Sequence, residues 1–96
     1  MSMAEIRRAG APHEIETLAA FRRHKAGSDG VIVIADGTRL PPKAHTPGCS
    51  FVKEESFVEK VLTNGGKEGV YFSFGTLDEA RAVVKAKPCG HCGATP

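Results

Sequence analysis

The sequence predicts a small single-domain α+β fold, in which a short β-sheet is packed against two or three helices. The chain has 96 residues, of which 41% are hydrophobic, enough to enclose one modest core but not two. Two runs rich in β-branched and aromatic residues, at 31–34 and 70–74, have the composition of buried strands. Segments outside these runs carry apolar residues near helical spacing.

The N-terminal part is expected to contain one helix and one strand. Residues 1–11 offer few groups that could anchor them, so we expect a flexible N-terminus there. Residues 12–26 place Pro12 in a first helical turn, with acidic residues early and basic residues late, as the helix dipole favours. The strand at 31–34 lies between two Asp-Gly pairs, and the second pair, at 36–37, could start a hairpin.

A loop and a helix are expected next. The prolines at 41–42 restrict the chain to extended or edge structure and lead into a loop at 45–49. The apolar residues of 51–62 form an irregular helical stripe, with Ser50 as the candidate cap. Asn-Gly-Gly at 64–66 would stop this helix.

The remaining sequence predicts the second strand and a last helix. After the strand, Thr76 and Glu79 fit a capping box that opens a helix through Ala86. A Lys-Pro pair then ends this helix. We therefore expect a single folded domain over 12–93, followed by a tail at 94–96.

The charge balance points to no particular partner. Thirteen Lys and Arg stand against eleven Asp and Glu, which gives a formal net charge of +2, and the two signs are interleaved. The longest apolar run, at 31–35, is far shorter than the roughly 20 residues of a membrane span. Residues 1–10 lack the apolar stretch of a signal peptide, so we expect a cytoplasmic protein.

Three cysteines and one histidine form a candidate metal site. An odd number of cysteines in a short chain without a secretory signal argues for buried, reactive or metal-bound thiols. His45 and Cys49 are separated by three residues, and Cys89 and Cys92 by two. Four nitrogen and sulfur ligands complete the tetrahedral shell that zinc prefers. We predict a closed zinc site made by His45, Cys49, Cys89 and Cys92.

The turn chemistry of the first pair favours this site. The turn after His45 is predicted to be type II, because Pro47 presets φ and Gly48 can supply a positive φ. Such a turn folds the imidazole back toward Cys49. In the second pair, glycines next to the cysteines leave the backbone free to curl around a metal.

Other interpretations of these residues stay open. Cys49 could be an ordinary buried cysteine, with His45 in an exposed loop and the second pair incidental. Cys-Gly-His-Cys at 89–92 also spells the active-site tetrapeptide of disulfide isomerases. Only four residues follow it here, however, so we do not expect the helix that lowers the thiol pKa in thioredoxin-like proteins. The remaining histidines are expected at the surface: His13, His24 and His91.

Four stretches stand out when they are taken together: AHTPGCSFV at 44–52, VYFSF at 70–74, LDEA at 77–80 and KPCGHC at 87–92. In this order and spacing they resemble the zinc-binding domain of the Ada family. The family shares this order of a ligand pair separated by three residues, a short helix, a strand, a second helix and a terminal Pro-Cys-x-x-Cys. The resemblance covers about residues 31–93.

Two departures limit what the resemblance implies. In the Ada repair protein all four zinc ligands are cysteines, and the first removes a methyl group from DNA phosphotriesters. The matching residue here is His45, and imidazole cannot accept the methyl as a thiolate does, so the repair chemistry is not expected to transfer. Members whose first ligand pair is a histidine and a cysteine occur beside nuclease domains as structural or binding elements. The second departure is a long insertion at 53–69.

The sequence therefore predicts a zinc-binding module rather than an enzyme. A closed site leaves no position for water or substrate, so zinc would support a surface that binds nucleic acid or protein. The alternative is a thiolate-based alkyl acceptor or a thiol redox protein. Motifs of conventional hydrolases and of phosphate-binding loops do not occur in the sequence. The lysines considered for nucleic-acid contacts are Lys43, Lys53, Lys85 and Lys87.

Overall fold

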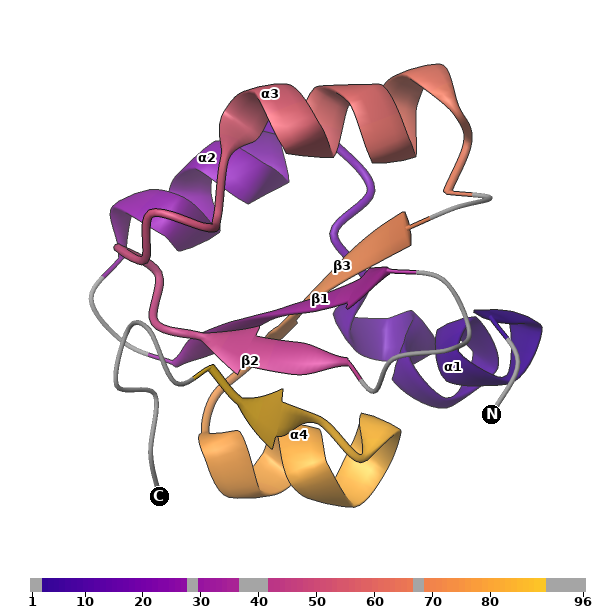
Figure 1. Ribbon diagram of the computed structural model, residues 1–96, viewed down its shortest axis with the longest axis vertical. Helices are drawn as coiled ribbons and strands as arrows, with labels where there is room; N and C mark the ends of the chain where they lie inside the picture. Colours follow the sequence, from indigo (N-terminus) through magenta and orange to yellow (C-terminus); the bar gives the residue numbers. More distant parts are fainter. Residues whose placement is uncertain (1–2, 28–29, 37–41, 67–68, 90–96) are drawn as a thin grey trace.

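The computed structural model describes residues 3–27, 30–36, 42–66 and 69–89. Within these ranges, a four-stranded mixed sheet lies between two layers of helices (Figure 1). The elements in chain order are α1 (Met3–Gly10), η1 (Ala11–His13), α2 (Leu18–Ala26), β1 (Val31–Asp36), β2 (Lys43–His45), α3 (Glu54–Phe57), η2 (Val58–Thr63), β3 (Gly69–Phe74), α4 (Leu77–Val84) and β4 (Lys87–Pro88). The predicted α+β class is confirmed.

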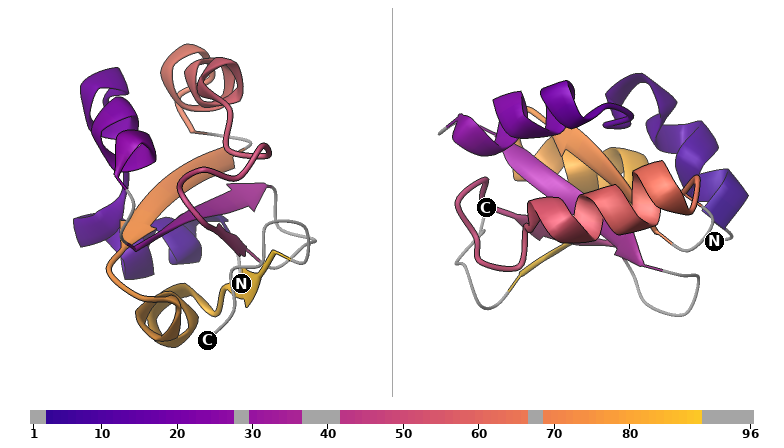
Figure 2. Two further views of the ribbon diagram at one scale, coloured as in Figure 1. Left: turned by 90° about the vertical axis from the view of Figure 1, so that its left-hand side faces the viewer. Right: turned by 90° about the horizontal axis from the view of Figure 1, so that it is seen from above.

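The sheet has the strand order β3-β1-β2-β4. β1 is antiparallel to both β2 and β3, whereas β4 is parallel to β2. The helices α2 and α3 cover one face of this sheet, and α1 and α4 cover the other (Figure 2). Antiparallel neighbours β1 and β2 agree with the expected hairpin, although Gly37 of the expected turn lies outside the described residues.

The two faces of the sheet carry separate cores. Alternate residues of a strand point to opposite faces, so Val33 packs with α1 and α4 while Ile32 packs with α2 and α3. Burial on both faces explains why β1 is a continuous apolar run rather than an alternating one. In the α2/α3 core, the Phe21 ring stacks on Phe57 with centroids 4.6 Å apart and meets Tyr71 edge-on at 5.8 Å.

The flexible N-terminus expected at 1–11 is wrong for the described residues from Met3 onward. They form α1, whose Ile6 is only 2% exposed and belongs to the core that α4 completes. Gly10 lies so close to the Phe72 ring that a Cβ would approach it to 2.6 Å. Packing of a short apolar face, which local sequence signals do not reveal, therefore orders this segment.

The helix expected over 12–26 is shorter than predicted. Residues 11–13 form the 3-10 turn η1, and the chain then extends so that the Ile15 N–H donates to the Tyr71 carbonyl at 2.8 Å. The helix α2 begins only at Leu18, where the Thr17 hydroxyl accepts a hydrogen bond from the Ala20 N–H. A backbone hydrogen bond to β3 therefore takes the place of the first turns of the expected helix.

The helix expected over 51–62 also starts later. Lys53 occupies the N-cap position of α3, so Ser50 is not the cap. The helix widens into the π-helical η2, and positive φ angles at Gly65 and Gly66 follow its end, in agreement with the predicted stop.

The C-terminal elements largely follow prediction. The strand at 70–74 and the cap at Thr76 are confirmed, because the Glu79 N–H donates to the Thr76 hydroxyl at 3.1 Å. The last helix ends at Val84 rather than Ala86, since Lys85 adopts the left-handed conformation with φ 56°. The tail expected at 94–96 lies outside the described residues. Among the described residues, no helix combines the length and apolar character needed to cross a membrane.

Gly10→Ala is expected to lower the free energy of unfolding by about 1–3 kcal/mol, because the added methyl would overlap the buried Phe72 ring. Gly75→Ala is the matched control, since nothing lies within 4 Å of its Cβ position. Urea denaturation measures both variants. Wild-type stability of Gly10→Ala would show that α1 does not pack against β3 as described.

Candidate metal centre

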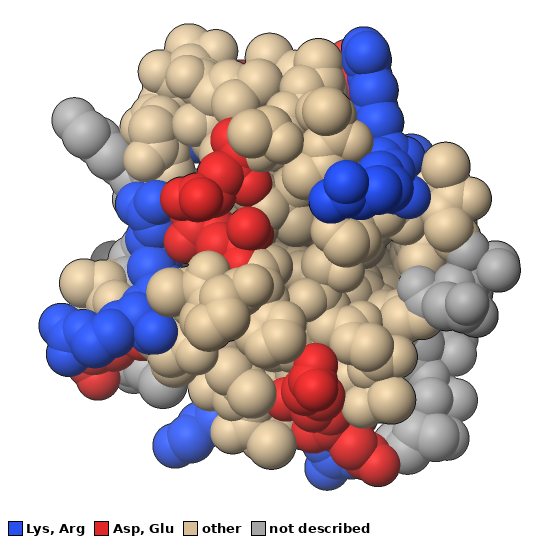
Figure 3. Space-filling model, turned by 180° about the vertical axis from the view of Figure 1, so that it is seen from behind, with Lys and Arg blue, Asp and Glu red and all other residues tan. Residues whose placement is uncertain are grey.

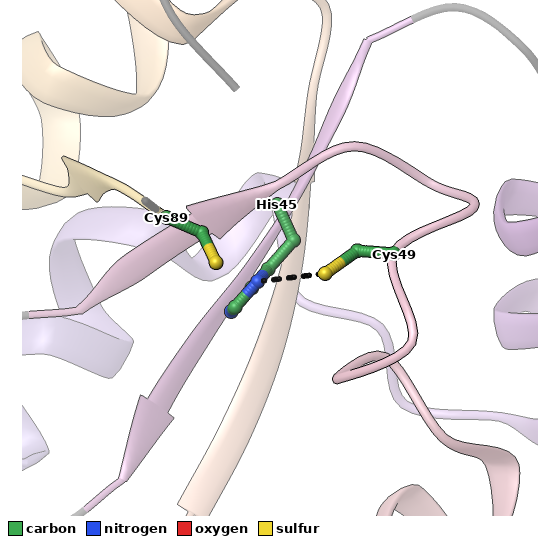
Figure 4. A group of neighbouring side chains, drawn as sticks. All are labelled: His45, Cys49 and Cys89. Carbon is green, nitrogen blue, oxygen red and sulfur yellow. Dashed lines mark hydrogen bonds between the residues drawn. The ribbon is translucent and has the colours of Figure 1, made fainter. Parts of the chain in front are cut away.

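Three side chains with metal-ligand chemistry meet at one end of the β2–β4 pair. His45 is the last residue of β2, Cys49 follows in a turn, and Cys89 comes directly after β4. Their donor atoms all lie within 4.8 Å of one another. Figure 4 shows the sulfur atoms of Cys49 and Cys89 directed toward the His45 imidazole from opposite sides. Residues 40 positions apart in the sequence thus converge.

Strand pairing places His45 beside Cys89. Ala44 and Pro88 are register partners in the parallel β2–β4 pair, so the residues that follow them are neighbours. The Cys89 N–H donates to the Ala44 carbonyl at 2.8 Å and holds this arrangement. His45 also lies opposite Ile32 of β1, which directs the imidazole to the sheet face covered by α2 and α3.

A turn brings Cys49 back to His45, as predicted, but its type differs. The Cys49 N–H donates to the Thr46 carbonyl at 3.0 Å and closes the turn. The expected positive φ at Gly48 is wrong, because Gly48 is not among the positive-φ glycines of the described residues. Lys25 of α2 donates to the Pro47 carbonyl at 3.4 Å, which fastens the turn to the neighbouring helix.

The spacing of the His45 and Cys49 donors is compatible with a shared metal ion such as zinc. Cys49 Sγ lies 3.6 Å from His45 Nδ1, a separation that permits a sulfur–imidazole hydrogen bond. With ordinary zinc–sulfur and zinc–nitrogen bond lengths, the same two ligands in a tetrahedral shell are also about 3.6 Å apart. A metal ion could therefore join these donors with little rearrangement of this pair. Two sulfurs and one imidazole nitrogen are ligands that zinc accepts.

All three donor residues are buried, and burial affects the protonation of His45. His45 and Cys49 are each 4% exposed and Cys89 is 6% exposed. Burial, and secondarily the positive charge of Lys43, lowers the pKa of His45 below its ordinary value. The imidazole is therefore held neutral at physiological pH, the form in which its nitrogen lone pair can bind a metal.

The structure brings together three of the four predicted ligands. Cys92, the predicted fourth ligand, lies outside the described residues, as does His91. Of the predicted pair Cys89 and Cys92, the structure therefore describes only Cys89.

Three aromatic rings make contacts that the sequence does not predict. His24 is half-buried, with Nδ1 3.0 Å from the Ser73 hydroxyl, and the His13 ring packs on Phe74 at 4.5 Å. Both rings are half-buried, so the surface positions expected for these histidines are only partly confirmed. Phe51 lies edge-on to the His45 imidazole, with centroids 6.2 Å apart. These contacts depend on how separate elements pack, and no local pattern marks them.

Comparisons of this chain with protein-family models, with curated proteins and with solved structures found no match. Its function is therefore inferred from its own residues.

Gly48→Ala is expected to leave metal affinity and stability unchanged within about 0.5 kcal/mol, because its Cβ would meet nothing within 4 Å and φ is not positive. The type II turn expected from the sequence would instead cost about 1–2 kcal/mol on this substitution. Thermal unfolding with metal bound distinguishes the two turns. A clear loss of stability would restore the sequence-based prediction.

Acidification is expected to destabilise the fold partly through His24. Burial, with a smaller contribution from Arg23, lowers the pKa of His24, so the unfolded chain binds the proton more readily. Stability is then complete above about pH 6.5, the ordinary histidine pKa, and falls as the pH drops through that value. Urea midpoints between about pH 7.5 and 5.5 should fall less steeply in His24→Gln than in wild type. Identical slopes would contradict this role.

Proposed function

We propose that this chain is a small zinc-binding protein in which a structural zinc ion joins the turn after β2 to the C-terminal segment. The ligands would be His45, Cys49, Cys89 and Cys92. The observation that carries the proposal is the convergence of three buried donors within 4.8 Å. Bound there, zinc would contribute folding free energy, as structural zinc does in other small domains.

The resemblance to the Ada zinc-binding family supports this assignment, and we propose that the chain is an Ada-like module whose site combines one histidine with three cysteines. His45 occupies the position of the methyl-acceptor cysteine, which argues against methyl transfer. Burial of Cys49 and Cys89 argues further against an alkyl-acceptor or redox function, because both need an accessible thiolate. We therefore propose a binding module rather than an enzyme, in a reducing compartment such as the cytoplasm.

The charge of the protein favours selective contacts over general attraction to nucleic acid. Three thiolates and one zinc ion would change the formal net charge from +2 to about +1. Acidic and basic residues are interspersed with uncharged surface on the face shown in Figure 3. A partner, whether protein or nucleic acid, would therefore have to recognise a local surface.

The proposal predicts one zinc ion per chain in the purified protein, measured by elemental mass spectrometry. Replacement by Co²⁺ should give the intense visible absorption of a tetrahedral site with three sulfur ligands and one nitrogen ligand. Folded protein that contains no metal and takes up none would contradict the proposal.

Single substitutions identify the ligands. Cys49→Ser, Cys89→Ser and Cys92→Ser are each expected to lose zinc and to unfold the C-terminal part of the chain, because removing a ligand opens the closed shell. His91→Ala is the matched control and should keep both metal and fold. Equal metal loss in His91→Ala and the cysteine variants would show that the ligand set is different.

A further inference from the structure

Phe51 is an aromatic side chain that the fold leaves on the surface beside the metal centre. It is 52% exposed, and its ring stands at 85° to the His45 imidazole, 6.2 Å away. The next residue, Val52, is buried and anchors the backbone, whereas Lys53 is exposed again. The ring is therefore held at a defined place, with a positive charge close by along the chain.

Two further lysines lie on the sheet face to which His45 belongs. Lys43 precedes His45 by two positions on β2, so both side chains leave the same face, with Cα atoms about 6.6 Å apart. Lys87 of β4 is the register partner of Lys43 and shares this face. Both lysines are exposed. Lys85 is different, because it ends α4, the helix on the opposite face.

The acidic residue next to Lys53 pairs with an arginine. Glu54 follows Lys53, but its carboxylate accepts hydrogen bonds at 2.7 and 3.1 Å from the Arg22 guanidinium. Another cation, Lys25, donates to the Pro47 carbonyl in the turn that carries Cys49. The surface around the metal centre thus combines one exposed ring with several ammonium groups.

We propose that this surface binds single-stranded nucleic acid, with a base stacked on Phe51 and phosphates contacted by Lys43, Lys53 and Lys87. Exposed rings flanked by lysines suit single strands, because each nucleotide offers a flat apolar face and an anionic phosphate. In a duplex, the base faces are already stacked on one another and are closed to Phe51. The inference rests on the proposed function, since the zinc centre would hold β2, β4 and the turn together.

The test is fluorescence anisotropy of a labelled ten-nucleotide oligothymidine with the zinc-loaded full chain at low salt. Three phosphate contacts on a single strand predict a slope of about −2 for log affinity against log salt, or roughly 20-fold weaker binding at 200 mM than at 50 mM salt. Phe51→Ala should weaken binding by about fivefold to a hundredfold, and Phe51→Tyr should retain it. The double variant Lys43→Gln/Lys87→Gln should make the slope of log affinity against log salt shallower by about 1.4.

Two exposed residues elsewhere provide matched controls. Leu62→Ala removes the other large exposed hydrophobic side chain among the described residues, and Arg81→Gln removes a positive charge from α4 on the opposite face. Neither should weaken binding by more than about twofold if the surface beside the metal centre is the site.

Three results would overturn the inference: no oligonucleotide binding at 50 mM salt, equal affinity for a duplex of the same length, or wild-type affinity of Phe51→Ala. If the zinc-loaded wild-type protein does not bind the oligonucleotide, only this inference is overturned. A protein is then the remaining class of partner. Absence of zinc from folded wild-type protein would overturn the proposed function instead.

Discussion

The β4 edge of the sheet is held by its pairing with β2, and His45, Cys49 and Cys89 converge at the end of that pair. β4 has two residues, and two backbone hydrogen bonds of 2.8 Å flank it, from Lys87 to Pro42 and from Cys89 to Ala44. Bonds of this kind contribute about 1 kcal/mol each, which is little for holding a chain end in register. A metal ion shared by the three donors would supply a much stronger connection at the same place.

The cluster is continuous with the core between the sheet and α2/α3. Cys49 and Cys89 belong to the same apolar cluster as Ile32, Phe21 and Phe57. Metal binding at this cluster would therefore be coupled to packing of the core, because displacing either sulfur would also disturb the apolar contacts around it. The contact from Lys25 to the Pro47 carbonyl would extend this coupling to α2. The opposite core, which α1 and α4 build, contains none of the three donors.

Much of this arrangement could be predicted from the sequence where the signal is local. The β-branched run at 31–34, the capping box at Thr76 and the spacing of His45 and Cys49 each define their own structure. The strands β1 and β3, the helix α4 and three of the candidate ligands follow from such signals.

The errors arise where a distant contact overrides local preference. Gly10 lies against Phe72 of β3, and Ile6 belongs to the core that includes α4, and neither contact is marked by a local pattern. Residues 12–16 look helical, yet residues 12 and 13 belong to the 3-10 turn η1, and the hydrogen bond from Ile15 to Tyr71 holds the residues after it out of the helix. The local signal at 87–88 indicates only the end of a helix, but register with Lys43 and Ala44 makes this pair a strand. Such pairings bring together residues that are far apart in the sequence.

The central claim is that a metal ion holds the C-terminal segment against β2, and amide hydrogen exchange tests it most directly. Zinc-loaded and chelator-treated protein would be compared at the Cys89 and Lys87 amides, with the Ile32 amide of β1 as the internal reference. The account predicts that metal removal accelerates exchange at Cys89 and Lys87 by at least about tenfold more than at Ile32. Equal protection of Cys89 and Lys87 with and without metal would contradict it.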